Sequence, residues 1–188
     1  MSDSDLKRCE WCEKDDLYRT YHDEEWGVES HDDEHLFEHL ILETFQAGLS
    51  WHTILRKREN FRKAFEGFNA NRVAQYGDNE VERLLSDEGI IRNKAKINAA
   101  INNAGCFLAT QKEWGSFDRF IWSFAPEKKV NRIRDWNDVL VTTPESDAMS
   151  KALKKQGFKF VGSTTCYAFM QAVGMVDDHF DYCWKKKK

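Results

Sequence analysis

The chain is nearly free of proline, the strongest breaker of helices, and this feature constrains its fold more than any other. Only two prolines occur in 188 residues, Pro126 and Pro144. Proline breaks the interior of a helix because it lacks the amide hydrogen and clashes with the preceding turn. Stretches that alternate between apolar and polar residues are scarce, whereas apolar residues recur with the helical period along most of the length. The pattern predicts an all-α protein.

Several segments carry signals for individual helices. The first predicted helix begins at Asp32 or Asp33, either of which could cap it, and stops at Gly48. Further helices are predicted over 51–65, on both sides of a tight turn at 89–93, over 116–124, from 146 to 157, and from 163 onward. Residues 126–146 are predicted to be an irregular connection. The chain is therefore expected to form one domain over 1–188, or two tightly packed helical lobes.

Composition narrows the class of protein. The net charge of −4 argues against bulk electrostatic binding of nucleic acid, although 28 lysines and arginines leave room for a local basic face. No apolar run is long enough to cross a bilayer, and no apolar segment marks a secretory signal. Five cysteines without an evenly paired framework suit a reducing compartment. We expect a cytoplasmic protein without membrane contact, whose clustered cysteines serve a metal or catalysis.

Metal-ligand residues gather at both ends of the chain. His179 and Cys183 are four positions apart, which is one helical turn, and Cys9, Cys12 and His22 stand near the amino terminus. A structural zinc ion takes four ligands, and thiolate and imidazole groups suit it. The spacing predicts a zinc site that joins residues 9–22 to 179–183. It leaves open which cysteine of the amino-terminal pair binds, and ordinary buried thiols are the alternative interpretation.

A second metal hypothesis rests on His35, His39 and Glu43, which resemble two histidines and a carboxylate for iron. Each step of four residues rotates about 40° around a helix, so the three side chains diverge. Glu43 falls at the margin of the apolar face and is expected to be sheltered. His35 and His39 are predicted to lie on a solvated flank.

A sheltered glutamate needs hydrogen-bond donors, and the residues near Glu43 in the sequence are aromatic. Ring faces attract positive charge, while a carboxylate accepts from an exocyclic amine, so a flat cationic ligand such as an alkylated purine fits this setting. Packing of the core is the alternative role of these rings, and it is the commoner one. The aromatic residues concerned are Trp11, Tyr18, Tyr21, Trp26 and Trp51.

Longer strings of the sequence resemble one known family. The stretches RCEWC, YHDEEWG, LETFQAGLSWHTILRKRENFRKAFEGF, GIIRNKAKI, SKALKKQGFKFVGSTTCYAFMQAVG and DDHFDYC occur in this order between Cys9 and Cys183. Together they closely resemble the bacterial DNA-3-methyladenine glycosylase I family, and the resemblance covers nearly the whole chain. It implies the helix-hairpin-helix DNA glycosylase fold.

The resemblance also implies roles for individual residues. One structural Zn²⁺ per chain would be held by Cys9, His22, His179 and Cys183, with Cys12 as a non-ligand. Glu43 would recognise the amino group of 3-methyladenine, with Trp11, Tyr21 and Trp51 around the base and Tyr18 and Trp26 beside them. Backbone groups of the hairpin would hold a DNA phosphate without much basic charge. The hairpin residues are Gly89, Ile90, Ile91, Arg92 and Asn93.

The implied activity is DNA repair: base flipping in alkylated double-stranded DNA and hydrolysis of the N-glycosidic bond, with free 3-methyladenine as product. We expect a monomeric, monofunctional glycosylase. Asp118 is the nearest candidate for the sugar-supporting aspartate of other helix-hairpin-helix glycosylases, but the resembled family works without one. The hairpin departs from the usual pattern in having only Gly89, with Ala95 at the later small-residue position. A zinc-containing module that binds damaged bases without cutting is the alternative.

Overall fold

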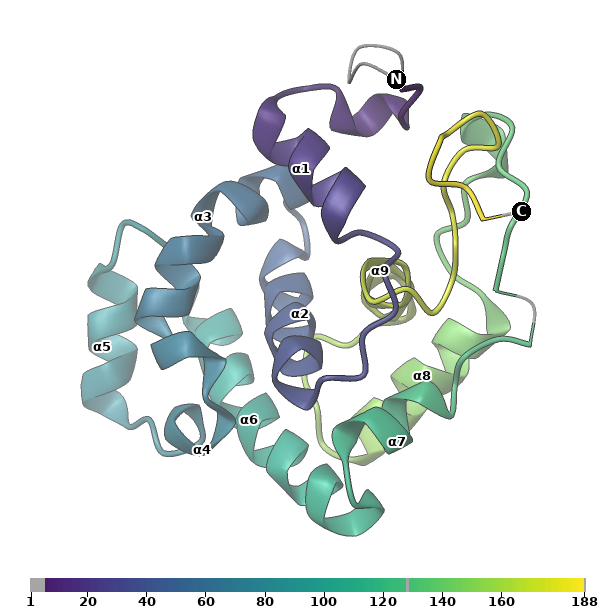
Figure 1. The fold of residues 1–188 in the computed structure, drawn as a ribbon. Coiled ribbons are helices and arrows are strands. Elements are labelled where there is room, and N and C mark those ends of the chain that lie inside the picture. The colour runs from purple at the N-terminus through teal and green to yellow at the C-terminus, as the bar shows by residue number, and fades with distance from the viewer. Residues whose placement is uncertain (1–5, 128, 188) are drawn as a thin grey trace.

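The computed structural model describes residues 6–127 and 129–187. Within these residues the chain forms nine α helices and three short 3₁₀ helices, and its only bridge of the β type joins Val130 to Asp177 (Figure 1). The all-α prediction is confirmed. The elements are η2 (Glu10–Cys12), α1 (Asp16–Glu24), α2 (Asp33–Gln46), α3 (Trp51–Ala64), η3 (Glu66–Phe68), α4 (Ala70–Val73), α5 (Asp78–Ser86), α6 (Lys94–Trp114), α7 (Phe117–Trp122), η4 (Trp136–Asp138), α8 (Pro144–Lys155) and α9 (Ser163–Ala172).

Helix α2 is the centre of the molecule and contacts α3, α6, α7 and α9 (Figure 1). It begins as the sequence predicts, because the Asp32 carboxylate accepts a hydrogen bond from the His35 amide at 2.8 Å. Gly48 follows its end with a φ of 79°, a conformation that favours glycine. Because α2 is surrounded, Glu43 near its end is carried into the interior.

The predicted helix, tight turn and helix at 78–114 are present as α5, residues 87–93 and α6. Asn93 caps α6 by accepting from the Lys96 amide at 3.1 Å. Lys57 of α3 donates to the carbonyl of Gly89 at 3.2 Å, and Lys96 donates to the carbonyl of Phe45 at 2.8 Å. The turn is therefore fixed against the end of α2 and against α3.

Helix α1 has no counterpart among the helices predicted from the sequence. It is nine residues long, and only Tyr21 and His22 are buried in it. One aromatic and one polar residue do not make an apolar stripe, so the sequence of α1 shows no helical repeat of apolar residues from which the helix could be predicted. Asp15 starts the helix by accepting from the Tyr18 amide at 2.9 Å.

The prediction of a helical turn between His179 and Cys183 is wrong, because residues 177–187 run without helix. This segment pairs with residues 129–133 instead. The Asp177 amide donates to the carbonyl of Lys129 at 2.7 Å, and the Asp181 amide donates to that of Ile133 at 2.7 Å. Of residues 126–146, which were predicted to be irregular, 144–146 begin α8, and the described residues of 126–143 contain no helix other than the short η4. This segment lies beside the carboxy-terminal segment (Figure 1).

The two ends of the described chain meet. The Trp184 amide donates to the carbonyl of Lys7 at 2.9 Å. Cys9, Ile133, Phe180 and Cys183 form a small buried cluster apart from the main core. No helix within residues 6–127 and 129–187 is long and apolar enough to span a membrane.

Candidate functional site

A cavity of about 250 Å³ opens between the central helix and the joined ends of the chain. It is lined by all six residues that the sequence proposed for a base-binding site, Trp11, Tyr18, Tyr21, Trp26, Glu43 and Trp51. Sequence reasoning missed the other wall residues, which include Gln46, Ile133, Trp136, Val139, Ala168, Gln171, Asp178 and Phe180. Most of these come from the irregular segments and from α9, where no local pattern indicates which side chains face a cavity.

Glu43 is the sheltered acid that the sequence predicts. Its side chain belongs to α2 and is only 3% exposed. Its Oε2 atom has no hydrogen-bond partner among the described residues. Burial raises the pKa of Glu43 to about 8. A buried carboxyl without a donor is costly, so this position is suited to a ligand that brings a hydrogen-bond donor or a positive charge.

The rings around Glu43 form two groups. Tyr21 of α1 lies against Trp51 at the start of α3, with ring centroids 5.5 Å apart. Trp11 stands edge-on to Tyr18 at 4.9 Å and to Trp26 at 5.0 Å. The indole nitrogen of Trp51 is buried and has no partner within the described part of the chain. The cavity thus offers aromatic faces, one free indole N–H and one carboxyl group.

Both tyrosines keep their protons at neutral pH. Burial raises the pKa of Tyr18 to about 12, and burial likewise raises the pKa of Tyr21 well above its usual value. The phenol groups are therefore neutral. Glu43, with its pKa raised to about 8, can change charge near neutral pH.

A polar network holds three of the lining helices together. Arg58 of α3 donates to both carboxylate oxygens of Glu25 at 2.7 Å and also contacts Glu38 of α2. His39 Nε2 lies 2.7 Å from Glu25 Oε1. The prediction that His39 is solvated is wrong, because it is 0% exposed and its ring stacks on Trp51 with a centroid distance of 6.1 Å.

The same network contradicts the hypothesis that His35, His39 and Glu43 bind an iron ion. Glu25, not Glu43, lies close to His35 and His39. Arg58 binds both oxygens of Glu25 and reaches to 3.5 Å from His39 Nε2, so a fixed positive charge stands where a cation would bind. Burial lowers the pKa of His39. The group behaves as a set of ion pairs and hydrogen bonds between α1, α2 and α3.

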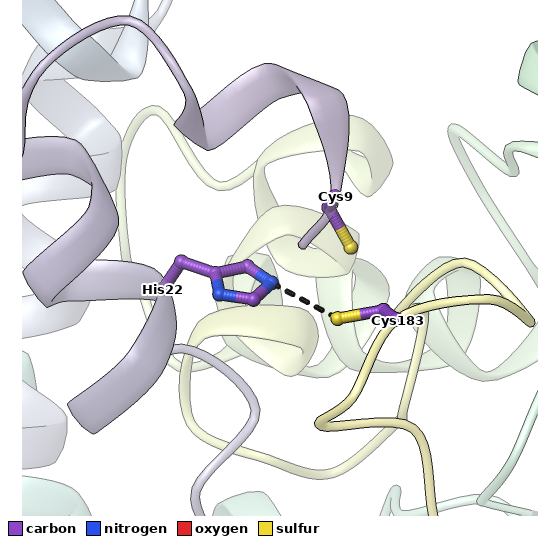
Figure 2. A group of neighbouring side chains, drawn as sticks. All are labelled: Cys9, His22 and Cys183. Carbon is purple, nitrogen blue, oxygen red and sulfur yellow. Dashed lines mark hydrogen bonds between the residues drawn. The ribbon is translucent and has the colours of Figure 1, made fainter. Parts of the chain in front are cut away.

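At the joined ends, three of the four predicted metal ligands converge (Figure 2). The ligand atoms of Cys9, His22 and Cys183 all lie within 4.8 Å of one another, and all three side chains are buried. His22 Nε2 is 3.4 Å from the Cys183 sulfur. Asp23 lies 2.7 Å from the other ring nitrogen of His22, which orients the imidazole.

The fourth predicted ligand, His179, lies near this cluster but is not among the three residues whose ligand atoms are mutually within 4.8 Å. Its Nδ1 atom is 2.8 Å from Asp177 Oδ1, while its buried Nε2 atom has no partner among the described residues. The His22 and His179 rings are 5.1 Å apart. Cys12 is buried beside them and is not one of the three clustered residues, and its thiol donates to the carbonyl of Cys9 at 3.0 Å. Two thiols and two oriented imidazoles fit the donor set of a structural zinc ion.

Other residues that the sequence singled out lie elsewhere. Asp118 is in the first turn of α7 and lies 2.7 Å from His31 Nδ1, outside the cavity lining. Two further cysteines also lie outside the cavity lining, and burial raises the pKa of Cys166 to about 12 and also raises that of Cys106, so neither is a reactive thiolate. In the hairpin, Ile90 is buried while Arg92 and Asn93 are exposed.

Comparisons with known proteins agree with one another. The family model described as methyladenine glycosylase matches residues 11–186. DNA-3-methyladenine glycosylase 1 of Escherichia coli strain K12 is 48% identical over 95% of this chain and 96% of its own length. DNA-3-methyladenine glycosylase of Haemophilus influenzae is 46% identical over 94% of this chain and 96% of its own.

Solved structures of similar proteins have the same fold. A crystal structure of 3-methyladenine DNA glycosylase I superposes with a TM-score of 0.93 at 48% identity, covering 96% of this chain and 100% of the other. The Staphylococcus aureus enzyme of the same name gives 0.92 at 35% identity, covering 97% and 98%. A variant of a 3-methyladenine DNA glycosylase I, solved in complex with 3-methyladenine, gives 0.91 at 36% identity, covering 96% and 98%.

Proposed function

The chain belongs to the methyladenine glycosylase family, and on that premise we propose that it excises 3-methyladenine from alkylated double-stranded DNA in base excision repair. The observation that carries the proposal is Glu43, a desolvated carboxyl with an unpartnered oxygen in a cavity walled by aromatic rings. Adenine methylated at N3 in DNA is cationic and flat, and it carries an exocyclic amine. Such a ligand supplies the donor and the charge that Glu43 lacks.

The damaged nucleotide must leave the duplex before its base can enter the cavity, and this costs unstacking energy. Glu43 then accepts from the amino group of the base, while Trp11, Tyr21 and Trp51 enclose its faces. Tyr18 and Trp26 support these rings. Selection of the cationic base over ordinary purines comes from the ring faces and the carboxylate.

Hydrolysis breaks the bond between C1′ and the base nitrogen. Both electrons of the bond pass to the cationic base, which leaves as neutral 3-methyladenine, so no strong general acid is needed. The sugar becomes cationic at C1′, and a water oxygen bonds to that carbon and releases its proton to solvent. No lysine of the described part lines the cavity, and we propose a monofunctional enzyme without lyase activity.

The hairpin between α5 and α6 is proposed to hold the DNA backbone. Its residues Gly89, Ile90, Ile91, Arg92 and Asn93 lie at the amino-terminal end of the 21-residue helix α6, whose dipole favours an anion there. Arg92 and Asn93 are exposed, and Lys57 anchors the turn from α3. Backbone contacts of this kind fit a protein whose net charge is negative.

Zinc in this proposal is structural. Cys9, His22, His179 and Cys183 would hold one ion per chain, which would tie the ends of the chain together beside the cavity. We further propose that the whole chain acts as one monomeric catalytic unit in the bacterial cytosol. The competing function, a module that binds damaged bases without cutting, differs in leaving no free base and no abasic site.

The test is chromatography of the bases released from methylated duplex DNA. The purified protein is expected to release 3-methyladenine well above a protein-free control and in preference to 7-methylguanine. Absence of release from folded, zinc-containing protein would refute the glycosylase activity and leave the non-cutting module. Retention of DNA on the protein without base release would identify that module directly.

A further inference from the structure

One wall of the cavity comes from a segment that the proposed base contacts do not use. We call residues 129–139 the rim arm. It contributes Ile133, Trp136 and Val139 to the cavity lining. Trp136 differs from the inner aromatic residues because it is 55% exposed while still lining the cavity. Because Trp136 lines the cavity and is also exposed to solvent, it lies at the mouth of the cavity.

The arm holds Trp136 in a defined position. The indole N–H donates to Glu10 Oε2 at 3.1 Å, and the ring stands edge-on to Phe180 with centroids 5.2 Å apart. Asp135 caps η4 by accepting from the Asn137 amide at 2.8 Å. An exposed tryptophan fixed by two neighbours loses little freedom when it gains another contact.

The rest of the arm is bound to the end of the chain. The Asn131 amide donates to the carbonyl of Asp177 at 3.1 Å, and the Ile133 amide donates to the Asp181 carboxylate at 3.3 Å. These bonds flank the segment that carries His179. The position of Trp136 therefore depends on the same joined ends that form the candidate metal site.

The arm and the hairpin lie on opposite sides of α2 (Figure 1). On the hairpin side, Lys96 in the first turn of α6 binds the carbonyl of Phe45, next to the cavity residue Gln46. On the other side, Ile133, Trp136 and Phe180 form the wall. DNA bound through the hairpin and centred on the cavity would meet the arm beyond it.

We propose that Trp136 packs against the deoxyribose of the extruded nucleotide at the mouth of the cavity. This inference rests on the proposed function. The base occupies the interior between Glu43 and Trp51, so the sugar is the part of that nucleotide left at the mouth. An exposed indole face offers an apolar surface to the sugar carbons, which need no hydrogen-bond donor. Trp136 is thus a DNA-contacting residue that does not recognise the base.

If Trp136 contacts the sugar and not the base, its removal should weaken binding of DNA without weakening binding of the free base. We would measure the affinity of Trp136→Ala for a duplex containing a tetrahydrofuran abasic analogue and, separately, for free 3-methyladenine. Loss of the apolar contact should weaken binding of the abasic duplex about tenfold. The affinity for the free base should stay within about twofold, because the inner walls are untouched.

Two further variants complete the experiment. Trp136→Phe keeps an aromatic face and should recover most of the duplex affinity. Trp114→Ala removes a tryptophan that is 41% exposed but lies at the end of α6 outside the cavity lining, and its duplex affinity should equal that of the wild type. Unfolding temperatures of all variants would show whether any loss follows from a less stable fold.

Three results would overturn the inference. In the first, Trp136→Ala binds the abasic duplex as tightly as the wild type does. In the second, it loses affinity for the duplex and for free 3-methyladenine to the same extent. In the third, its duplex affinity falls together with its unfolding temperature, and Trp136→Phe does not restore the affinity. Failure of the proposed function looks different, because the wild-type protein itself would then release no base from methylated DNA.

Discussion

At the scale of single residues, the chemistry of this protein centres on one carboxyl group. Glu43 sits in a fully buried position whose pKa is raised to about 8 by desolvation. Near neutral pH the empty cavity therefore holds mostly a neutral acid. A cationic base would favour the ionised form, so binding of such a base is linked to loss of a proton from Glu43.

Because the pKa of Glu43 is raised in the folded protein, we predict that the free energy of unfolding depends on pH. Between the usual value of 4.5 and about 8, the folded state binds more protons at Glu43 than the unfolded state does. The free energy of unfolding should therefore fall as the pH rises through this range and level off above it. Glu43→Gln removes this dependence and should be more stable than wild type at pH 9 by roughly 1–3 kcal/mol.

Urea unfolding of both proteins at pH 5, 7 and 9 checks this prediction. The two should be similarly stable at pH 5 and diverge at higher pH. Parallel curves over the whole range would show that Glu43 ionises normally in the folded protein. The variant should also lose affinity for free 3-methyladenine, and retained affinity would remove Glu43 from the pocket.

At the scale of elements, the network around Arg58 decides how the helices of the cavity are placed. It joins the end of α1 through Glu25, α2 through Glu38 and α3 through Arg58 itself. Hydrogen bonds and charges of His35, His39 and Arg58 overcome burial and lower the pKa of Glu25. These helices carry Tyr21, Glu43 and Trp51, so the network also sets the distances within the cavity.

Arg58→Met should destabilise the fold strongly. It leaves the carboxylates of Glu25 and Glu38 without their shared partner, and breaking a buried ion pair from one side costs about 3–5 kcal/mol. Arg72→Met is the matched control, since its ion pair with Glu66 is exposed and its loss should not change stability measurably. Chemical denaturation compares the two, and equal stability of both variants would contradict a structural role for the network.

The hairpin provides a second prediction at this scale. A Cβ atom at Gly89 would lie 3.0 Å from Cβ of Asn60 and 2.9 Å from Asp87 Oδ1, so Gly89→Ala should displace the turn from α3. We expect several-fold weaker binding of duplex DNA and unchanged binding of free 3-methyladenine. Gly105→Ala in α6 meets nothing within 4 Å and should leave DNA binding intact while stabilising the helix by about 0.5–1 kcal/mol. Electrophoretic mobility shifts would show the difference, and equal affinities would argue against a role for the hairpin.

At the scale of the whole molecule, the two ends of the chain depend on each other. The terminal lysines take part, since Lys185 donates to the carbonyl of Asp23 at 2.7 Å and Lys186 to the carbonyl of Asp177 at 3.2 Å. Lys188 lies outside the described residues. Around these contacts, Cys9, His22, His179 and Cys183 form the candidate metal site.

Removal of the metal should loosen both ends together. Protein purified without a histidine tag is expected to contain one zinc per chain, and Cys183→Ser should lose it, with a lower unfolding temperature and faster proteolysis near both termini. Cys106→Ser changes a thiol outside this site and should keep its zinc. A stable wild-type protein without zinc would contradict the proposed site.

Much of this protein is determined by local sequence. The scarcity of proline and the helical period define α2, α3, α5, α6, α8 and α9, because each buries an apolar stripe or is capped by its own residues. The aromatic residues near Glu43 and the candidate metal ligands near the termini can also be identified from the sequence, since residue types limit the chemistry available. Spacing could not choose between Cys9 and Cys12, whose contacts differ only in the folded chain.

Only the tertiary structure decided the rest. A helical turn was predicted for residues 179–183, but residues 177–181 instead form backbone hydrogen bonds with residues 129–133, which are distant in sequence. His39 is buried because Glu25 and Arg58 come to it from other helices. Trp136 and Asp178 reach the cavity through irregular segments. In each case the deciding energy comes from contacts between distant segments, and no local period or propensity records such contacts.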